Sequence, residues 1–129
     1  MRRRRITSAS PYEAEIGFCR AMRVGDRILV AGTGPVEPDG SSTPGDVGAQ
    51  ADRCFAIIRA AIEELGGTMS EVVRTRMFLT DIADMGLVSA AHARAVGEAR
   101  PVATMLAVAA LARPEWKVEI EAEAVLGAD

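Results

Sequence analysis

The residues of this sequence that could do chemistry are few, and the most regular of them lie near its C-terminal end. Glu119, Glu121 and Glu123 alternate with apolar residues in the stretch VEIEAEAV. An alternation of period two places the three carboxylates on one face of a strand. Such a row can bind a cation, but pairing with Arg74 and Arg76 of an earlier strand is the simpler interpretation.

Other candidates carry weaker signals. His92 is the single histidine, which excludes a multi-histidine metal site, and a lone histidine is more often structural than a base. Asp81 and Asp84 are expected to cap a helix. The triplet GTG at residues 32–34 is too short for a dinucleotide fingerprint, and the sequence has no HExxH, GxSxG or P-loop motif. The motifs therefore indicate no metal site.

Length, composition and charge fit one domain over residues 1–129. The chain is 49% hydrophobic and 26% charged, which suits a single core. A net charge of −3 gives no reason to expect nucleic-acid binding, and no apolar run approaches the ~20 residues of a membrane span. No secretory signal is visible, so we expect a cytoplasmic location, with Cys19 and Cys54 as reduced thiols.

The elements that must position the candidates follow the order ββαβαββ. Residues 1 to about 15 are expected to be irregular, and the arginines at residues 2–5 to form a solvated tail more often than an arm for nucleic acid or phospholipid. Hydrophobic periodicity and turn residues predict strands at residues 18–24, 27–31, 72–79, 104–111 and 116–125, and helices at residues 46–65 and 84–97.

The same patterns predict a helix cap, a turn and the buried residues of two elements. Asp46 is expected to cap the first helix, and the last two strands to be joined by a short turn. In the strand at residues 72–79, Val73 is expected on the core face and Val72 on the opposite face. The buried stripe of the second helix is expected to hold Met85, Val88, Ala91, Ala95 and Val96.

The strand at residues 104–111 is apolar on both faces, and this is difficult to reconcile with a monomer. Two helices cover only one face of an α+β sheet. The other face keeps Leu106, Val108 and Ala110, or their alternates Met105, Ala107 and Ala109. An open apolar patch of several hundred Å² is unusual on a monomer, so we expect self-association through the open sheet face, with cyclic symmetry.

Four segments together resemble the RidA/YjgF family: DVGAQ at residues 46–50, VVRTRMFLTD at 72–81, RP at 100–101 and VEIEA at 118–122. The resemblance runs from about Phe18 to Val125. It implies a chorismate-mutase-like α+β fold with one mixed sheet and two helices on one face. It also implies a homotrimer whose sheets line a central barrel, with ligand clefts between subunits, and hydrolysis of reactive enamines and imines without a cofactor.

Carried over residue by residue, the resemblance places the water-handling glutamate at Glu119 and the strand-end glycine at Gly32. The family's arginine, which binds the substrate carboxylate, falls on Ala103, and its tyrosine falls on Phe18. An asparagine of the second helix corresponds to Ser89. Thr104 and Met105 follow Ala103 and would line an apolar pocket. Arg20 or Arg76 would have to replace the lost anchor, and His92 is a candidate proton carrier at the cleft edge.

The sequence is compatible with three functions. The first is a trimeric hydrolase of enamines, imines or related labile carbonyl derivatives, with Glu119 handling water. The second is a module of the same architecture that binds a small metabolite without turnover. Ribonuclease activity, sometimes ascribed to relatives, is the weakest because the chain has a net charge of −3 and no pair of histidines.

Overall fold

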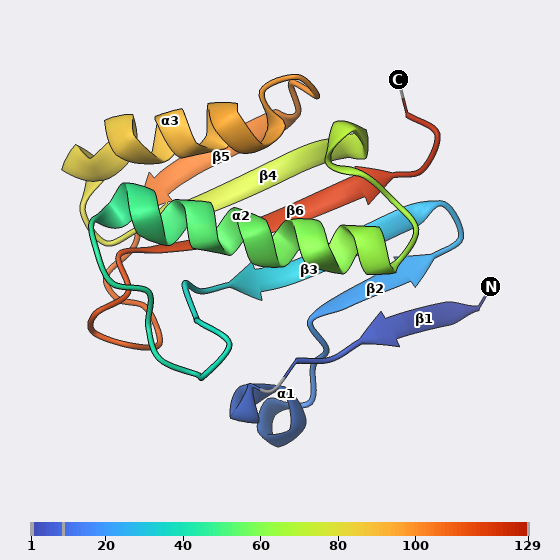
Figure 1. Ribbon diagram of the computed structural model, residues 1–129, viewed down its shortest axis with the longest axis horizontal. Helices are drawn as coiled ribbons and strands as arrows, with labels where there is room; N and C mark the ends of the chain where they lie inside the picture. Colours follow the sequence, from blue (N-terminus) through green and yellow to red (C-terminus); the bar gives the residue numbers. More distant parts are fainter. Residues whose placement is uncertain (1, 9, 129) are drawn as a thin grey trace.

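A six-stranded mixed sheet in the order β1-β2-β3-β6-β4-β5 forms the centre of the structure, with helices α2 and α3 on one face (Figure 1). The computed structural model describes residues 2–8 and 10–128. Its elements are β1 (Arg3–Ile6), α1 (Pro11–Ile16), β2 (Ala21–Val24), β3 (Arg27–Thr33), α2 (Val47–Glu64), the 3₁₀ turn η1 (Met69–Glu71), β4 (Val72–Leu79), the 3₁₀ turn η2 (Ile82–Asp84), α3 (Met85–Val96), β5 (Val102–Ala107) and β6 (Val118–Val125).

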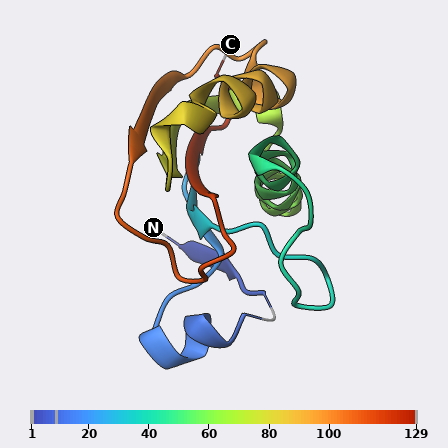
Figure 2. The same ribbon diagram turned by 90° about the vertical axis from the view of Figure 1, so that its left-hand side faces the viewer.

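The last strand, β6, lies in the middle of the sheet, antiparallel to β3 on one side and to β4 on the other. Its alternation is as predicted: Val118, Ile120, Ala122 and Ala124 are buried under the helices, and the three glutamates are half-buried on the opposite face. We call that opposite side the open face. Figure 2 views the sheet from its edge, with α2 along one side of the strands.

Helix α2 confirms the prediction from its sequence. The side chain of Asp46 accepts a hydrogen bond from the backbone N–H of Ala49 at 2.9 Å, as an N-cap should. The apolar residues of the helix that are buried against the sheet include Ala51, Cys54, Phe55, Ile58, Ala61 and Ile62. At the other end, Arg4 and Arg23 donate to the backbone carbonyls of Glu64 and Leu65, both at 3.0 Å. These cations meet the negative end of the helix dipole.

The N-terminal prediction was wrong, because residues 3–6 form a strand and residues 11–16 a helix. β1 pairs antiparallel with β2, which places Arg4 beside Arg23 and gives both access to the end of α2. Ser10 caps α1 by accepting from the N–H of Tyr12, and Pro11 occupies the first helical turn. The arginine run is therefore part of an edge strand and not a solvated tail.

The predicted hairpin of the last two strands was also wrong. β5 runs parallel to β4 at the edge of the sheet, in register from Arg74 with Val102 to Leu79 with Ala107. A parallel pair needs a crossover, and α3 supplies it. β5 ends at Ala107 instead of at residue 111, and the chain then returns to place β6 on the other side of β4 (Figure 1).

Three smaller differences concern individual residues. The pairing of β4 with β6 shifts between Val72 and Arg74, and this bulge turns Val72 into the core while Val73 is only half-buried. Met85 opens α3 and is exposed, whereas Val88, Ala91 and Val96 form its buried side. The first predicted strand begins at Ala21 rather than at residue 18. No helix among the described residues is long and apolar enough to cross a membrane.

A close approach between Gly34 and Trp116 yields the first prediction. A Cβ on Gly34 would lie 2.5 Å from two ring carbons of Trp116, which is itself buried and donates from Nε1 to Ser42. Gly34→Ala should therefore lower the free energy of unfolding by about 1–3 kcal/mol. The midpoint of urea unfolding measures this.

The matched control is Gly86→Ala, because a Cβ there would meet nothing within 4 Å. Gly86 lies in α3, where alanine is favoured, so this change should stabilise the protein by up to about 1 kcal/mol. Equal effects of the two substitutions would contradict the steric explanation.

Candidate functional site

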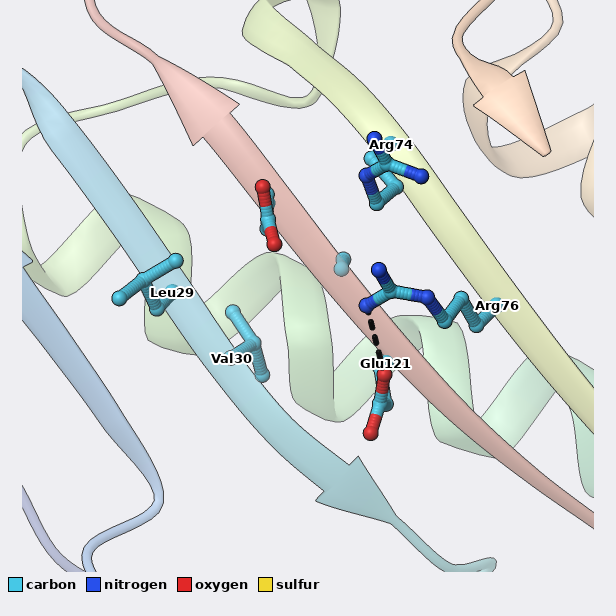
Figure 3. A pocket seen from close by; sticks show the side chains of 7 residues that line it. Leu29, Val30, Arg74, Arg76 and Glu121 are labelled. Carbon is cyan, nitrogen blue, oxygen red and sulfur yellow. Dashed lines mark hydrogen bonds and ion pairs between the residues drawn. The ribbon is translucent and has the colours of Figure 1, made fainter. Parts of the chain in front are cut away.

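The open face carries a lattice of opposite charges over β6 and its neighbours. Arg76 on β4 pairs with Glu121 at 3.2 Å, as the sequence predicted, and both side chains lie beside Arg74 over the strands (Figure 3). Glu123 pairs with Arg27 on β3 at 3.6 Å and not with Arg74. A shallow hollow of about 140 Å³ lies between these groups and is closed on one side by Leu29. The lattice accounts for two of the three glutamates.

The third glutamate, Glu119, lies against a glycine. Val30 pairs with Ala122 and Thr33 with Ile120, so two residues of β3 oppose the single Glu121, and a bulge results at Gly32. A Cβ at Gly32 would lie 2.9 Å from Oε2 of Glu119. The glycine thus leaves the space that the carboxylate occupies. Phe78 of β4 lies on the opposite side of Glu119, in register with it.

Arg20 lies at the other side of the same bulge. Its Nη1 donates to the carbonyl of Gly32 at 2.7 Å and to Oγ1 of Thr33 at 3.0 Å. Its guanidinium carbon lies 5.6 Å from the centroid of the Phe18 ring. Phe18, Arg20, Gly32 and Glu119 therefore form one group, which we call the Glu119 group.

Burial raises the pKa of the Glu119 carboxyl above its ordinary value, and the charge of Glu121 adds to the effect. The positive charge of Arg20 acts in the opposite direction. A carboxylate with a raised pKa is a stronger base than an exposed one, and this is the property that general-base chemistry on water requires.

The other predicted site residues lie elsewhere in the chain. Ser89 is exposed on α3. His92, also on α3, hydrogen-bonds through Nε2 to Oγ1 of Thr75 at 2.8 Å and packs edge-on against Phe55. Ala103 and Met105 are in register with Thr75 and Met77 on the helix-covered face of the sheet. We call these four predicted residues, Ser89, His92, Ala103 and Met105, the α3–β5 group.

Within one chain the sheet separates the two groups. His92 is tied to the helix-covered face, whereas Glu119 lies on the open face, so the structure does not bring them together. Burial lowers the pKa of His92, which favours the neutral ring. Of the three predicted site residues on β5, Thr104 differs from Ala103 and Met105, since it is in register with Arg76 on the open face.

The cysteines take no part in either group as nucleophiles. Cys54 is fully buried in α2, and burial, followed by the charge of Glu119, raises the pKa of its thiol. A neutral, inaccessible thiol is a core residue. Cys19 is only partly exposed, and its thiol approaches the carbonyl of Ala21 at 3.5 Å.

Sequence reasoning missed Glu13, whose carboxylate is only 4% exposed and lies 3.8 Å from Nε of Arg20. It was missed because residues 1–15 were expected to be irregular. A signal was present: in SPYE at residues 10–13, a serine precedes a glutamate by three positions, which is typical of a helix start. In the structure, however, Glu13 accepts from the backbone and side chain of Ser8 instead of from the cap residue.

This fold is the chorismate-mutase-like α+β fold predicted from the sequence, with one mixed sheet and two helices on one face. The chain belongs to the RidA/YjgF family, whose model, described as "Endoribonuclease L-PSP", matches residues 7–126. A crystal structure of a YjgF/YER057c/UK114 family member from Mycobacterium tuberculosis is 39% identical, superposes with a TM-score of 0.87 and covers 97% of this chain and 100% of its own.

Two further relatives are similar over most of their length, and one of them is named for an activity. An uncharacterised protein of Streptomyces coelicolor is 38% identical over 125 residues, which cover 97% of this chain and 93% of that protein. The protein named 2-iminobutanoate/2-iminopropanoate deaminase in Escherichia coli K12 is 32% identical over 116 residues, which cover 87% and 90% of the two chains. Some members of the family thus carry the name of an imine deaminase.

The raised pKa of Glu119 gives a prediction for stability. A carboxyl whose pKa is higher in the folded than in the unfolded state binds its proton more tightly when folded, so its contribution to stability is lost as pH rises through the folded pKa. Glu119→Gln should therefore stabilise the protein at neutral pH, and the gain should shrink as pH falls. Thermal unfolding between about pH 4 and about pH 8 measures it.

The control for this series is Glu123→Gln, which removes an equal charge from the same strand face but breaks only the ion pair with Arg27. It should change stability little, because the Arg27 side chain is 59% exposed. If Glu119→Gln is instead the less stable protein at neutral pH, the carboxylate is held by favourable contacts and its pKa is not raised.

Proposed function

We propose that this protein hydrolyses small enamines, imines or related labile carbonyl derivatives in a cleft between the subunits of a homotrimer. The observation that carries the proposal is the half-buried Glu119 carboxylate, fixed between Gly32 and Phe78 with a raised pKa. A relative with the same fold is named as a deaminase of 2-imino acids.

Hydrolysis of a C=N bond needs a water molecule and one group that transfers protons. Water adds to the carbon of the C=N bond, and the resulting carbinolamine expels ammonia to leave a carbonyl. Glu119 accepts a proton from the attacking water and returns it to the imine nitrogen, so one group serves as base and then as acid. The second proton with which the nitrogen leaves as ammonia comes from the carbinolamine hydroxyl, whose oxygen becomes the carbonyl. An enamine first shifts a proton from nitrogen to carbon and so becomes the imine. No cofactor takes part in these steps.

The need for a second subunit is supported by the position of the two groups. The sheet separates the Glu119 group from the α3–β5 group in one chain, so a cleft that uses both must take them from different chains. The open face also exposes Leu29, Val102 and Leu106 beside its arginines and glutamates. Apolar residues flanked by charges of both signs suit a contact between copies of the same chain.

The substrate is expected to differ from a simple 2-imino acid. The family arginine corresponds to Ala103, and loss of a bidentate contact with a carboxylate costs ~1.5–3 kcal/mol, or about one to two decades in binding. Phe18, Ala103 and Met105 make the proposed cleft more apolar. Ser89, His92 and Thr104 would supply polar contacts from the neighbouring chain.

A second candidate function is binding of a small metabolite without turnover. The observation in its favour is that two groups of the family's site, the arginine and the tyrosine hydroxyl, are absent at Ala103 and Phe18. Thermal-shift screening with keto acids and aromatic acids would show saturable stabilisation in either case. Turnover separates the two functions. Ribonuclease activity has no comparable support, since His92 is the only histidine and bonds to Thr75.

The activity prediction concerns ammonia release. Wild-type protein should accelerate release of ammonia from imino acids generated freshly by an amino-acid oxidase. Glu119→Gln should reduce this rate by about 10²–10⁴, the usual contribution of a positioned acid–base group. Glu123→Gln is the control, and should keep the wild-type rate. If all three proteins match the uncatalysed reaction across small and apolar imines, the hydrolase proposal fails and the binding function remains.

The assembly prediction concerns mass in solution. Light scattering at micromolar concentration should give three times the mass of one chain. Leu106→Glu should shift the population toward monomer, because it places an additional carboxylate on the open face beside Phe78, with which Leu106 is in register. A wild-type protein that is monomeric at these concentrations would remove both the trimer and the proposed cleft.

A further inference from the structure

A buried ion pair lies behind the Glu119 group. Glu13 is 4% exposed and Arg20 is 11% exposed, with Oε2 and Nε 3.8 Å apart. The carboxylate of Glu13 also accepts from the backbone N–H of Ser8, at 3.0 and 3.2 Å, and from the Ser8 hydroxyl. Burying two charges costs several kcal/mol per ion before their attraction is counted, so such a pair is weak support for stability by itself.

The pair holds Arg20 in a single orientation. Its Nη1 bridges the carbonyl of Gly32 and the hydroxyl of Thr33, and its guanidinium lies over the ring of Phe18. Its Nε is buried and faces Glu13 without a hydrogen bond to any described residue. These contacts tie the side chain to Glu13 and Phe18 on one side and to the bulge beside Glu119 on the other.

We propose that Arg20 is a positioning residue for Glu119: backed by Glu13 and Ser8, it fixes the Gly32 bulge against the carboxylate, on which its positive charge acts across that bulge. This inference rests on the proposed role of Glu119 in handling water. It assigns the N-terminal segment, which contributes Ser8 and Glu13, a part in the chemistry of the central strand.

The charges around Glu119 support the assignment. On its own strand, Glu121 raises the pKa of Glu119, and Lys117 is exposed two residues away. On β4, Arg76 is already paired with Glu121. From α2, the neutral thiol of Cys54 brings no charge, and β3 brings only Gly32. Among the described residues, Arg20 is the cation whose field lowers the pKa of Glu119.

Two variants of Arg20 separate charge from geometry. In Arg20→Gln the charge is lost, so the titration of Glu119, followed by carboxyl ¹³C NMR, should move to higher pH, and the acid limb of the rate profile should move with it. Arg20→Lys keeps the charge but removes the guanidinium group that donates to the Gly32 carbonyl and the Thr33 hydroxyl. Its titration should stay near that of the wild type, while turnover falls.

A third variant tests the pair from the other side. Glu13→Gln removes the counter-ion of Arg20 but can still accept from Ser8, so the titration of Glu119 should move to lower pH, opposite to Arg20→Gln. Arg27→Gln is the matched control. It removes a cation from the same sheet, paired with Glu123, and should leave the titration of Glu119 in place.

The NMR titration needs no substrate, so it decides this inference even if the hydrolase proposal fails. A Glu119 titration that is the same in Arg20→Gln and wild type, with folded protein in both, would overturn the positioning role. The role would also be overturned if Arg27→Gln moved the Glu119 titration as far as Arg20→Gln does. If Arg20→Gln does not fold, the direction of the shift in Glu13→Gln decides.

Discussion

The pairing of β6 with β3 and β4 at the same time is the interaction on which the rest of the structure depends. This strand is the last in the chain, yet it fills the centre of the sheet, so the core closes only when the C-terminal end is in place. Its apolar residues lie under α2. Its glutamates must then lie on the open face, where Arg76 and Arg27 meet two of them. The carboxylate of the third, Glu119, lies against Gly32 of the β3 bulge.

Local patterns were sufficient to predict the elements of the core but not all of their partners. The helix capped by Asp46, the strand Val72–Leu79 and the two faces of β6 follow from periodicity and capping, which act within a few residues. The partner of β5 does not. A turn between the last two strands was assumed, although the helix before β5 is what a parallel crossover from β4 requires. The bulge that turns Val72 inward likewise depends on β6, far along the chain.

The site was predictable to the extent that it lies on β6 and β3. Glu119 and Gly32 were chosen by resemblance, and the structure places the carboxylate against the glycine. Glu13 was not found, because the arginine run and the residues after it were interpreted as a tail. The contacts of that segment become visible only in three dimensions, where β1 extends the sheet and α1 brings a carboxylate to Arg20. No periodicity links positions 13, 20 and 119.

Three ionisable groups thus lie close together in a region where burial disfavours charge. Glu13 and Arg20 form an ion pair, and Glu119 is left as a half-buried carboxylate whose pKa is raised by burial. A core built for stability alone would place apolar residues here, since a buried pair is often replaceable by them at no loss. A carboxylate with a raised pKa beside a buried ion pair is typical of sites where chemistry takes place. Ala103 lies on β5, on the helix-covered face of the sheet, and takes no part in this arrangement. A substrate held by other contacts than those of a 2-imino acid, as proposed above, would therefore leave the surroundings of Glu119 unchanged.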